Sequence, residues 1–438
     1  MKWWCEIMSK PAATTLNDKA WEQLFEKYNI LESIEKYGHF EISSKAINEV
    51  REARLMAKFD HTINLPRIFT EHKLSILPIT RGDYVIAKFD AYHKFEESSS
   101  EITNYSIPNY IQSLDSNNIP SETIALNCAV AAGIIEDFLE DDKLISTVSG
   151  RMGSGVFDFN IDNADDSTSS TITVTNSQIE IDAAYEGINS LALFEAKRDI
   201  SEDFLVRQLY YPYRVWQSRI SKPVRPLFLV YSNGIYRLYE YEFKDPNNYS
   251  SIHLVKQKNY TIEDNTITAS DIQNILNSIK FEEEPKLPFP QADSIERVIN
   301  LCELLFNEEL SKDNITEKYA FDSRQSDYYT NAGRYLGIVD KPDKDRKSIY
   351  CLTDRGTSIL KLNYKKRQLA LCECILKHEV FSKVLSSYFQ NGTMPSKDKI
   401  VEFMKESHLY NISKDKTYYR RASTIIHWIN WIVGLIND

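Results

Sequence analysis

The chain has 438 residues, of which 42% are hydrophobic, and a formal net charge of −11. This length and apolar content predict about three domains with hydrophobic cores. No apolar run approaches the ~18 residues of a membrane span, and residues 1–10 are too polar for a signal peptide, so we expect a cytoplasmic protein without membrane contact. The six cysteines are scattered along the chain, which favours reduced thiols over disulfides or a zinc site.

The first 115 residues are predicted to form an accessory or DNA-recognition domain of helices and strands. Apolar residues recur at helical spacing over about 17–60, and residues 49–61 read as one continuous helix. Residues 74–95 alternate between apolar and polar on both sides of Arg81-Gly82-Asp83, which predicts two strands joined by a turn.

Residues 116–282 are predicted to form a second domain. It begins with one long helix over about 121–140, in which Glu136 is a candidate extra metal carboxylate or a solvated helix end. The glycine-rich stretch Ser149–Gly155 lacks the Gly-Lys-Ser/Thr ending of a nucleotide loop. It is either a flexible turn or a loop whose Arg151 contacts DNA. Residues 165–175 form a Ser/Thr-rich loop.

The most informative pattern is a pair of short strands that carry charged residues. Because side chains alternate along a strand, Glu180 and Asp182 share a face in the strand 178–182. Glu195 and Lys197 share a face in the strand 191–197, so a paired arrangement brings three carboxylates and one ammonium together. The alternative is a solvated acidic face, but such a row of carboxylates repels itself without a cation.

This set of side chains is suited to metal-assisted phosphodiester hydrolysis. Carboxylates bind Mg²⁺, which activates water and neutralises charge on phosphate. Asp182 and Glu195 are the candidate ligands, with Glu180 assisting. Lys197 is placed to orient or deprotonate the attacking water and to stabilise the pentacovalent phosphate. Glu186 and Asp199 are interpreted as loop charges.

Asp182 followed by Glu195-Ala196-Lys197 resembles the PD-(D/E)XK nuclease signature. The segment IEIDAAYEGINSLALFEAKRD, followed by FLVRQLYYPYRVW, is similar to the corresponding region of bacterial type II restriction endonucleases. Two departures are present: Ile181 replaces the proline, and Pro212 stands four residues after Gln208, where the family often has tyrosine. The resemblance implies a mixed-sheet nuclease core, Mg²⁺ as cofactor, and a catalytic role for Gln208 on a following helix. Arg207 beside it is a candidate DNA contact.

Two further segments follow the motif. Asn233-Gly234 between alternating apolar runs is a strong hairpin signal, and this hairpin is expected to extend the catalytic sheet. The proline-rich, charged stretch 281–290 is typical of a linker between domains.

Residues 292–361 resemble a winged helix. Helices are predicted over 295–306, from 315 and over 323–337, followed by a two-stranded wing over 338–353. The third helix would enter the major groove, with Arg324 and Gln325 suited to guanine and adenine, and Tyr328 and Asn331 one and two turns further on. The alternative is a module that contacts other proteins.

Residues 366–438 are predicted to form a helical, helix-turn-helix-like unit with helices over 397–407 and 414–436. Thirteen Lys and Arg face six Asp and Glu between positions 361 and 422, so this part is expected to contact phosphates, although the lysines could merely solubilise helices. Lys416, Arg420 and Arg421 are the candidate contacts. Trp428 and Trp431 are interpreted as core or dimer interface.

The sequence therefore predicts an α+β multidomain protein: a mixed-sheet PD-(D/E)XK nuclease core with a helical N-terminal region and C-terminal winged-helix and helical DNA-binding modules. The expected function is that of a type II restriction endonuclease, which cleaves double-stranded DNA at a specific short sequence. A homodimer and a protecting DNA methyltransferase are the expected partners. A modification-dependent or repair nuclease, and a winged-helix regulator that does not cleave, remain as alternatives.

Overall fold

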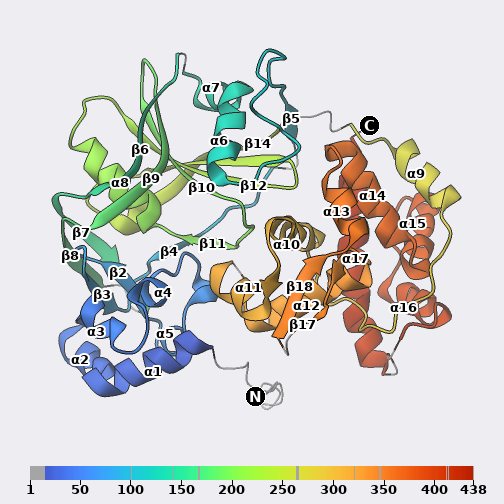
Figure 1. Ribbon diagram of the computed structural model, residues 1–438, viewed down its shortest axis with the longest axis horizontal. Coiled ribbons are helices and arrows are strands. Elements are labelled where there is room, and N and C mark those ends of the chain that lie inside the picture. The colour runs from blue at the N-terminus through green and yellow to red at the C-terminus, as the bar shows by residue number, and fades with distance from the viewer. Residues whose placement is uncertain are drawn as a thin grey trace.

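The structure, a computed structural model, describes residues 15–99, 101–141, 143–165, 168–262, 266–319, 321–344, 347–410, 412 and 414–437. The protein is α+β, with a mixed sheet flanked by an N-terminal lobe (blue) and a C-terminal helical lobe (orange to red) (Figure 1). Within these ranges no helix is both long and apolar enough to cross a membrane.

The N-terminal lobe packs short helices against a three-stranded antiparallel sheet of order β1-β3-β2. Its elements are α1 (Leu16–Tyr28), α2 (Ile30–Tyr37), β1 (His39–Ser43), α3 (Ser44–Asn48), α4 (Ala53–Ala57), α5 (Arg67–Glu71), β2 (Ser75–Pro78) and β3 (Asp83–Ala87). The expected continuous helix over 49–61 is wrong. The Asn48 side chain accepts from the Ala53 backbone N–H at 2.7 Å, and only the five residues of α4 are helical.

The central sheet has seven strands in the order β5-β14-β13-β12-β10-β9-β6. They are β5 (Ile102–Asn104), β6 (Ile145–Gly153), β9 (Gln178–Glu186), β10 (Leu191–Lys197), β12 (Val224–Ser232), β13 (Ile235–Phe243) and β14 (Ile252–Thr261). The pairs β10–β12 and β14–β5 are parallel, and all other neighbours are antiparallel. Because β5 belongs to this sheet, part of the segment 1–115 builds the central unit instead of the N-terminal lobe.

Helices cover both faces of this sheet. On one face α8 (Arg207–Gln217) buries Tyr210, whose ring packs against Phe243 of β13. On the other face lie α6 (Glu122–Ala131) and α7 (Ile134–Leu139). The expected single helix over 121–140 is broken between them, because Gly133 adopts the left-handed conformation with φ of +82°.

Two smaller strand pairs flank the central sheet. In addition, two segments that were expected to be loops are mostly strands. β7 (Val156–Asp162) pairs with β8 (Ser169–Thr175), which buries Ile172 and Val174, so most of the expected Ser/Thr-rich loop is a strand. The expected glycine-rich loop is also mostly strand, since β6 extends to Gly153. β4 (Tyr92–Lys94) pairs with β11 (Asp203–Leu205), which follows β10 in the chain.

The Asn233-Gly234 hairpin is confirmed. Ser232 pairs with Ile235 across a two-residue turn. Asn233 and Gly234 have φ of +54° and +77°, the two positive values that a type I′ turn requires.

The C-terminal lobe contains the expected order of three helices and a wing. Its elements are α9 (Ala269–Ser278), α10 (Ile295–Asn307), β15 (Leu310–Ser311), α11 (Lys312–Lys318), α12 (Ser323–Tyr335), β16 (Val339–Asp340), β17 (Asp343–Lys344), β18 (Lys347–Leu352), α13 (Asp354–Leu360), α14 (Tyr364–Leu376), α15 (Glu379–Asn391), α16 (Lys397–Glu406) and α17 (Asp415–Gly434). One hydrophobic core runs from Ile267 to Ile432, so the modules expected at 292–361 and 366–438 share a core. Trp428 is fully buried in it, as the core interpretation predicted.

Candidate active site

A pocket of about 320 Å³ lies at the carboxyl end of β10. It is lined by side chains from the N-terminal lobe, α6, β6, β9, β10 and α8. Seven of the predicted residues line it: Arg151, Glu180, Asp182, Glu195, Lys197, Arg207 and Gln208. The structure thus brings together residues that were predicted from the two strands, the helix after them and the glycine-rich stretch.

The charged residues do not form a polar face of the hairpin, as simple alternation predicted. Leu191 and Leu193, which precede Glu195 on the same face of β10, are buried against Ile181 and Ala184. β10 is therefore apolar on both faces, as expected for a strand next to a parallel neighbour. The charges gather where the strand ends.

Asp182 lies at an irregularity in β9. Between Ile181 and Ala184 this strand advances three residues while β6 advances two, from Val148 to Gly150. Such bulges re-aim side chains beside active sites. Asp182 Oδ2 accepts from the Ala196 backbone N–H at 2.8 Å, which fixes the carboxylate against β10. Burial raises the pKa of Asp182.

Glu195, Lys197 and Gln208 form a buried hydrogen-bonded group. Lys197 Nζ and Gln208 Nε2 both donate to Glu195 Oε1, each at 2.6 Å. Burial raises the pKa of Glu195 to about 7, and the neighbouring Asp182 adds to the rise while Lys197 opposes it. Burial disfavours the Lys197 ammonium, but Glu195 and Asp60 outweigh this and raise the pKa of Lys197.

Three charged pocket residues were missed by the sequence reasoning. Lys58 and Asp60 come from the loop after α4, and Glu122 comes from the first turn of α6. Asp60 Oδ2 lies 3.7 Å from Lys197 Nζ. No local pattern marks these positions as functional, because all three precede the motif and meet it only in the folded chain.

Two expectations about other carboxylates are corrected. Glu136 lies on α7 and does not line the pocket; Glu122 is the helix-borne carboxylate that does. Asp199 is not a solvated loop charge, since its Oδ2 lies 3.3 Å from His61 Nε2 and both side chains are largely buried. Burial lowers the pKa of His61, but Asp199, the Asp203 carbonyl and Asp60 together outweigh it and raise the pKa.

The pocket suits a small divalent cation in its chemistry, although no cluster of three His, Cys, Asp or Glu side chains arranged to hold a metal occurs within the described ranges. Mg²⁺ is commonly held by one or two carboxylates, with waters and substrate phosphates completing its shell. The pKa values of the Asp182 and Glu195 carboxyl groups are both raised. A cation bound nearby would favour the ionised form of both groups. Asp60 Oδ1 is buried without a hydrogen-bond partner.

The other DNA-contact candidates lie in the C-terminal lobe, outside this pocket. Arg324, Gln325, Tyr328 and Asn331 are on α12, and Lys416, Arg420 and Arg421 are in the first turns of α17. Arg324 is exposed. Burial and the adjacent Arg420 lower the pKa of Arg421 to about 10, with Tyr328 opposing.

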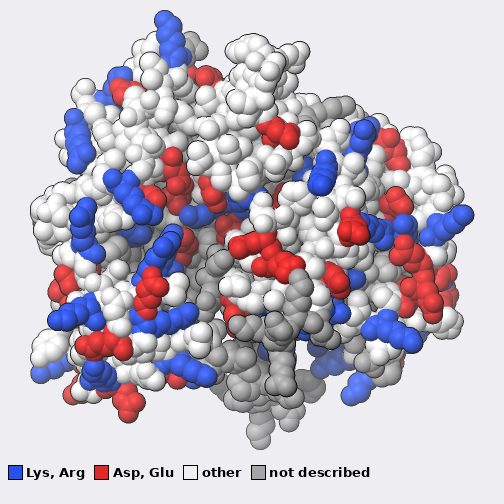
Figure 2. Space-filling view, in the orientation of Figure 1, with Lys and Arg blue, Asp and Glu red and all other residues white. Residues whose placement is uncertain are grey.

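The expected basic surface between 361 and 422 is partly neutralised by ion pairs. Lys365 pairs with Asp271 at 3.0 Å, Lys377 with Glu282 at 3.2 Å and Lys383 with Glu406 at 3.0 Å. Basic and acidic side chains are interspersed over the visible face of this lobe (Figure 2). A continuous phosphate-binding surface is therefore not evident from charge alone.

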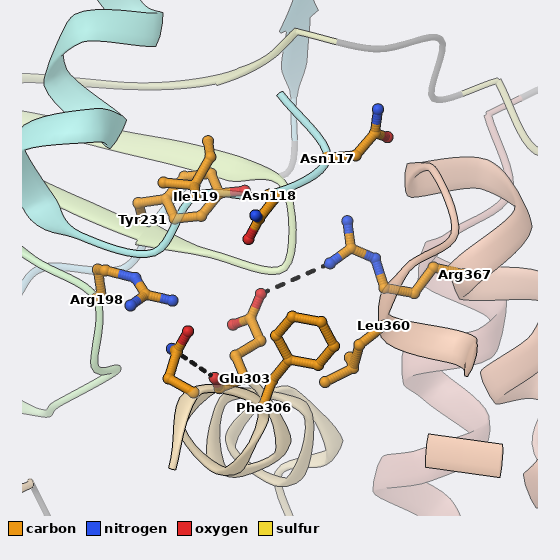
Figure 3. Close-up of a pocket in the computed structure, with 10 residues that line it drawn as sticks. Asn117, Asn118, Ile119, Arg198, Tyr231, Glu303, Phe306, Leu360 and Arg367 are labelled. Atoms are coloured by element: carbon orange, nitrogen blue, oxygen red, sulfur yellow. Dashed lines mark hydrogen bonds and ion pairs between the residues drawn. The ribbon is translucent and has the colours of Figure 1, made fainter. Parts of the chain in front are cut away.

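A much smaller pocket lies between α10 and the central sheet (Figure 3). Its volume of about 30 Å³ suits a water molecule rather than a substrate. Glu303 Oε1 lies 3.7 Å from Arg367 Nη1 and accepts from the Asn233 backbone N–H at 2.9 Å. This pocket therefore lies in the interface between the central sheet and the C-terminal lobe.

Three family models match the chain, and each is described only as a domain of unknown function. They cover residues 18–86 (DUF6996), 87–261 (DUF6997) and 297–437 (DUF7226). The division at 86/87 coincides with the end of β3, and the second match spans the central sheet. No curated protein and no solved structure matches the chain.

Proposed function

We propose that this chain is a PD-(D/E)XK-type nuclease that hydrolyses double-stranded DNA with Mg²⁺, and that it acts as a type II restriction endonuclease. The observation that carries the proposal is the convergence of Asp182, Glu195 and Lys197 in one pocket, with Gln208 bonded to Glu195. The parallel pair β10–β12, joined through α8, is consistent with the mixed sheet of such a nuclease core.

In this proposal Asp182 and Glu195 hold the cation. Bound Mg²⁺ would supply activation of water and neutralisation of charge on the phosphate. Gln208 holds the Glu195 side chain in place through its amide. Such supporting hydrogen bonds orient metal ligands and are often needed for full activity.

Lys197 acts as a charged group in this proposal. Its raised pKa keeps the ammonium protonated at neutral pH, which favours orientation of the water and stabilisation of phosphate charge over proton abstraction. Lys58, Arg151 and Arg207 add positive charge to the pocket lining, where they would attract the DNA backbone.

Sequence recognition is assigned to the C-terminal lobe, with α12 as the helix that enters the major groove. Cleavage of both strands at a palindromic site requires two active sites, so the proposed active form is a homodimer. A DNA methyltransferase that protects the host sites is the proposed functional partner.

The test compares cleavage of unmethylated and methylated phage DNA in Mg²⁺ by the wild type and by Lys197→Ala. Lys222→Ala is the matched control, because Lys222 is paired with Glu186 at 2.8 Å outside the pocket. Discrete fragments from the wild type and the control, and a loss of roughly 10²–10⁴-fold in Lys197→Ala, are expected. Cleavage by Lys197→Ala at the wild-type rate would refute this active site.

The same experiment separates the alternatives. Cleavage restricted to methylated DNA would identify a modification-dependent enzyme. Specific binding without cleavage of either substrate would identify a regulator with an inert nuclease domain.

A further inference from the structure

The loop after α4 joins the N-terminal lobe to the strand that follows the active site. The Asp60 carbonyl accepts from the Leu205 backbone N–H at 2.9 Å. His61 Nδ1 donates to the Asp203 carbonyl at 2.6 Å, and the Thr62 backbone N–H donates to Asp203 Oδ1 at 3.1 Å. These contacts fix the backbone at Asp60 and at the two residues after it, which sets the position of the Asp60 side chain relative to β10.

The Asp60 side chain is directed into the proposed catalytic pocket. Its Oδ2 atom lies 3.7 Å from Lys197 Nζ and 3.9 Å from Lys58 Nζ. Its Oδ1 atom is buried without a hydrogen-bond partner. A buried carboxylate oxygen that lacks a partner is costly, and native structures keep few of them. The ammonium groups of Lys197 and Lys58 beside Oδ2 offset the burial of this carboxylate.

The contacts of Glu195 with Lys197 indicate a role for the neighbouring Asp60. In the structure Glu195 Oε1 accepts from both Lys197 and Gln208. In its proposed role Glu195 directs its charge at a divalent cation, which repels the neighbouring ammonium. The Lys197 side chain is only 18% exposed, and a buried charge without a partner is strongly disfavoured. Asp60 is not one of the two proposed metal ligands. Its carboxylate already lies within ion-pair distance of Lys197.

We propose, resting on the nuclease function above, that Asp60 is a positioning residue that retains the Lys197 ammonium when Glu195 binds the metal. The N-terminal lobe thereby completes the active site instead of serving only as an accessory or DNA-reading module. Asp60 in this role touches neither the metal nor the phosphate, and acts through Lys197.

Lysine labelling tests this role without depending on catalysis. The full-length wild type, Asp60→Asn and Glu49→Gln are treated with an amine-reactive acylating reagent, with and without Ca²⁺, and labelling of Lys197 is measured by peptide mass spectrometry. Glu49→Gln is the matched control, because Glu49 is an ion-paired carboxylate of the same lobe outside the pocket. We expect Ca²⁺ to raise Lys197 labelling several-fold in Asp60→Asn, and to leave it unchanged in the other two proteins.

Metal binding separates this role from direct ligation. Asp60→Asn is expected to bind Ca²⁺ in calorimetry with the wild-type dissociation constant. A large loss of affinity would make Asp60 a metal ligand and overturn the proposal. Lys197 labelling that does not respond to Asp60→Asn in the presence of Ca²⁺ would also overturn it.

Single-turnover cleavage gives the last readout. Asp60→Asn is expected to lower the cleavage rate by about 10–100-fold at unchanged DNA affinity, and Asp60→Glu to recover part of it. Thermal melting shows whether Asp60→Asn is folded; if it is not, Asp60→Ala carries the labelling test with the same expected response to Ca²⁺. If the wild type shows no Lys197-dependent cleavage, the nuclease function fails, while labelling still decides whether Asp60 retains Lys197.

Discussion

Metal binding at Asp182 and Glu195 is expected to tighten by about tenfold between pH 6 and pH 8. Burial raises the pKa of Glu195 to about 7, and a carboxylate must lose its proton to bind a metal. With that pKa, about one tenth of the Glu195 side chains are ionised at pH 6 and about nine tenths at pH 8. The apparent affinity follows the ionised fraction, which gives the tenfold change.

The same pKa determines how the metal-free fold responds to pH. The pKa of Glu195 is raised from its usual 4.5 to about 7, so both the folded and the unfolded state are protonated below pH 4.5. Between 4.5 and 7 the unfolded chain releases this proton first, and the contribution of Glu195 to the free energy of unfolding falls as pH rises through that window. Saturating metal removes this loss, so the metal-induced rise in melting temperature should be larger at pH 8 than at pH 6.

Calorimetric titration of Mg²⁺ into DNA-free protein at pH 6, 7 and 8 measures the effect directly. Asp182→Asn should abolish the binding. Glu186→Gln, on the same strand but outside the pocket, should leave it intact. Equal affinities at pH 6 and pH 8, or full binding by Asp182→Asn, would show that these carboxylates are not the ligands.

Three further outcomes are expected. Gly234→Ala should lower the free energy of unfolding by about 2–4 kcal/mol in urea denaturation, because φ is +77° and an added Cβ would lie 2.9 Å from Tyr364 Cδ2; an unchanged midpoint would contradict this. Gln208→Leu should slow single-turnover cleavage by about 10–100-fold without weakening DNA binding, because it releases Glu195; wild-type turnover would remove Gln208 from the site. Arg324→Ala should weaken binding to the cognate site by about 1–3 kcal/mol in fluorescence anisotropy, and an equal loss on random DNA would indicate a phosphate contact.

The features that the sequence predicted correctly depend on short-range patterns. The strand that ends at Lys197, the helix that starts at Arg207 and the Asn233-Gly234 turn each follow from the alternation or conformational preference of adjacent residues. The sequence also predicted that Asp182 lies near Glu195, because only one turn separates their two strands.

The features that were missed depend on contacts between distant parts of the chain. Asp60 and Glu122 enter the pocket through lobe packing, which no local spacing reports. β5 joins the central sheet as a parallel edge strand far from β14 in sequence, which no short-range pattern indicates. The proline-rich stretch 281–290 is not a free linker, because Glu284 Oε2 accepts from the Tyr335 hydroxyl at 2.7 Å within the C-terminal lobe.

In the proposed restriction endonuclease, the hairpin tip that docks on α10 and α14 would limit how the target site can change. Asn233 and Gln368 exchange two side-chain hydrogen bonds at 3.0 and 2.8 Å, and Ser232 donates to Glu303 at 2.6 Å, all in buried positions. A C-terminal lobe transplanted onto another catalytic sheet would bring Gln368 and Glu303 without these partners and leave them buried and unpaired. New specificity is therefore more accessible through substitutions on the exposed side of α12 than through exchange of whole modules between relatives.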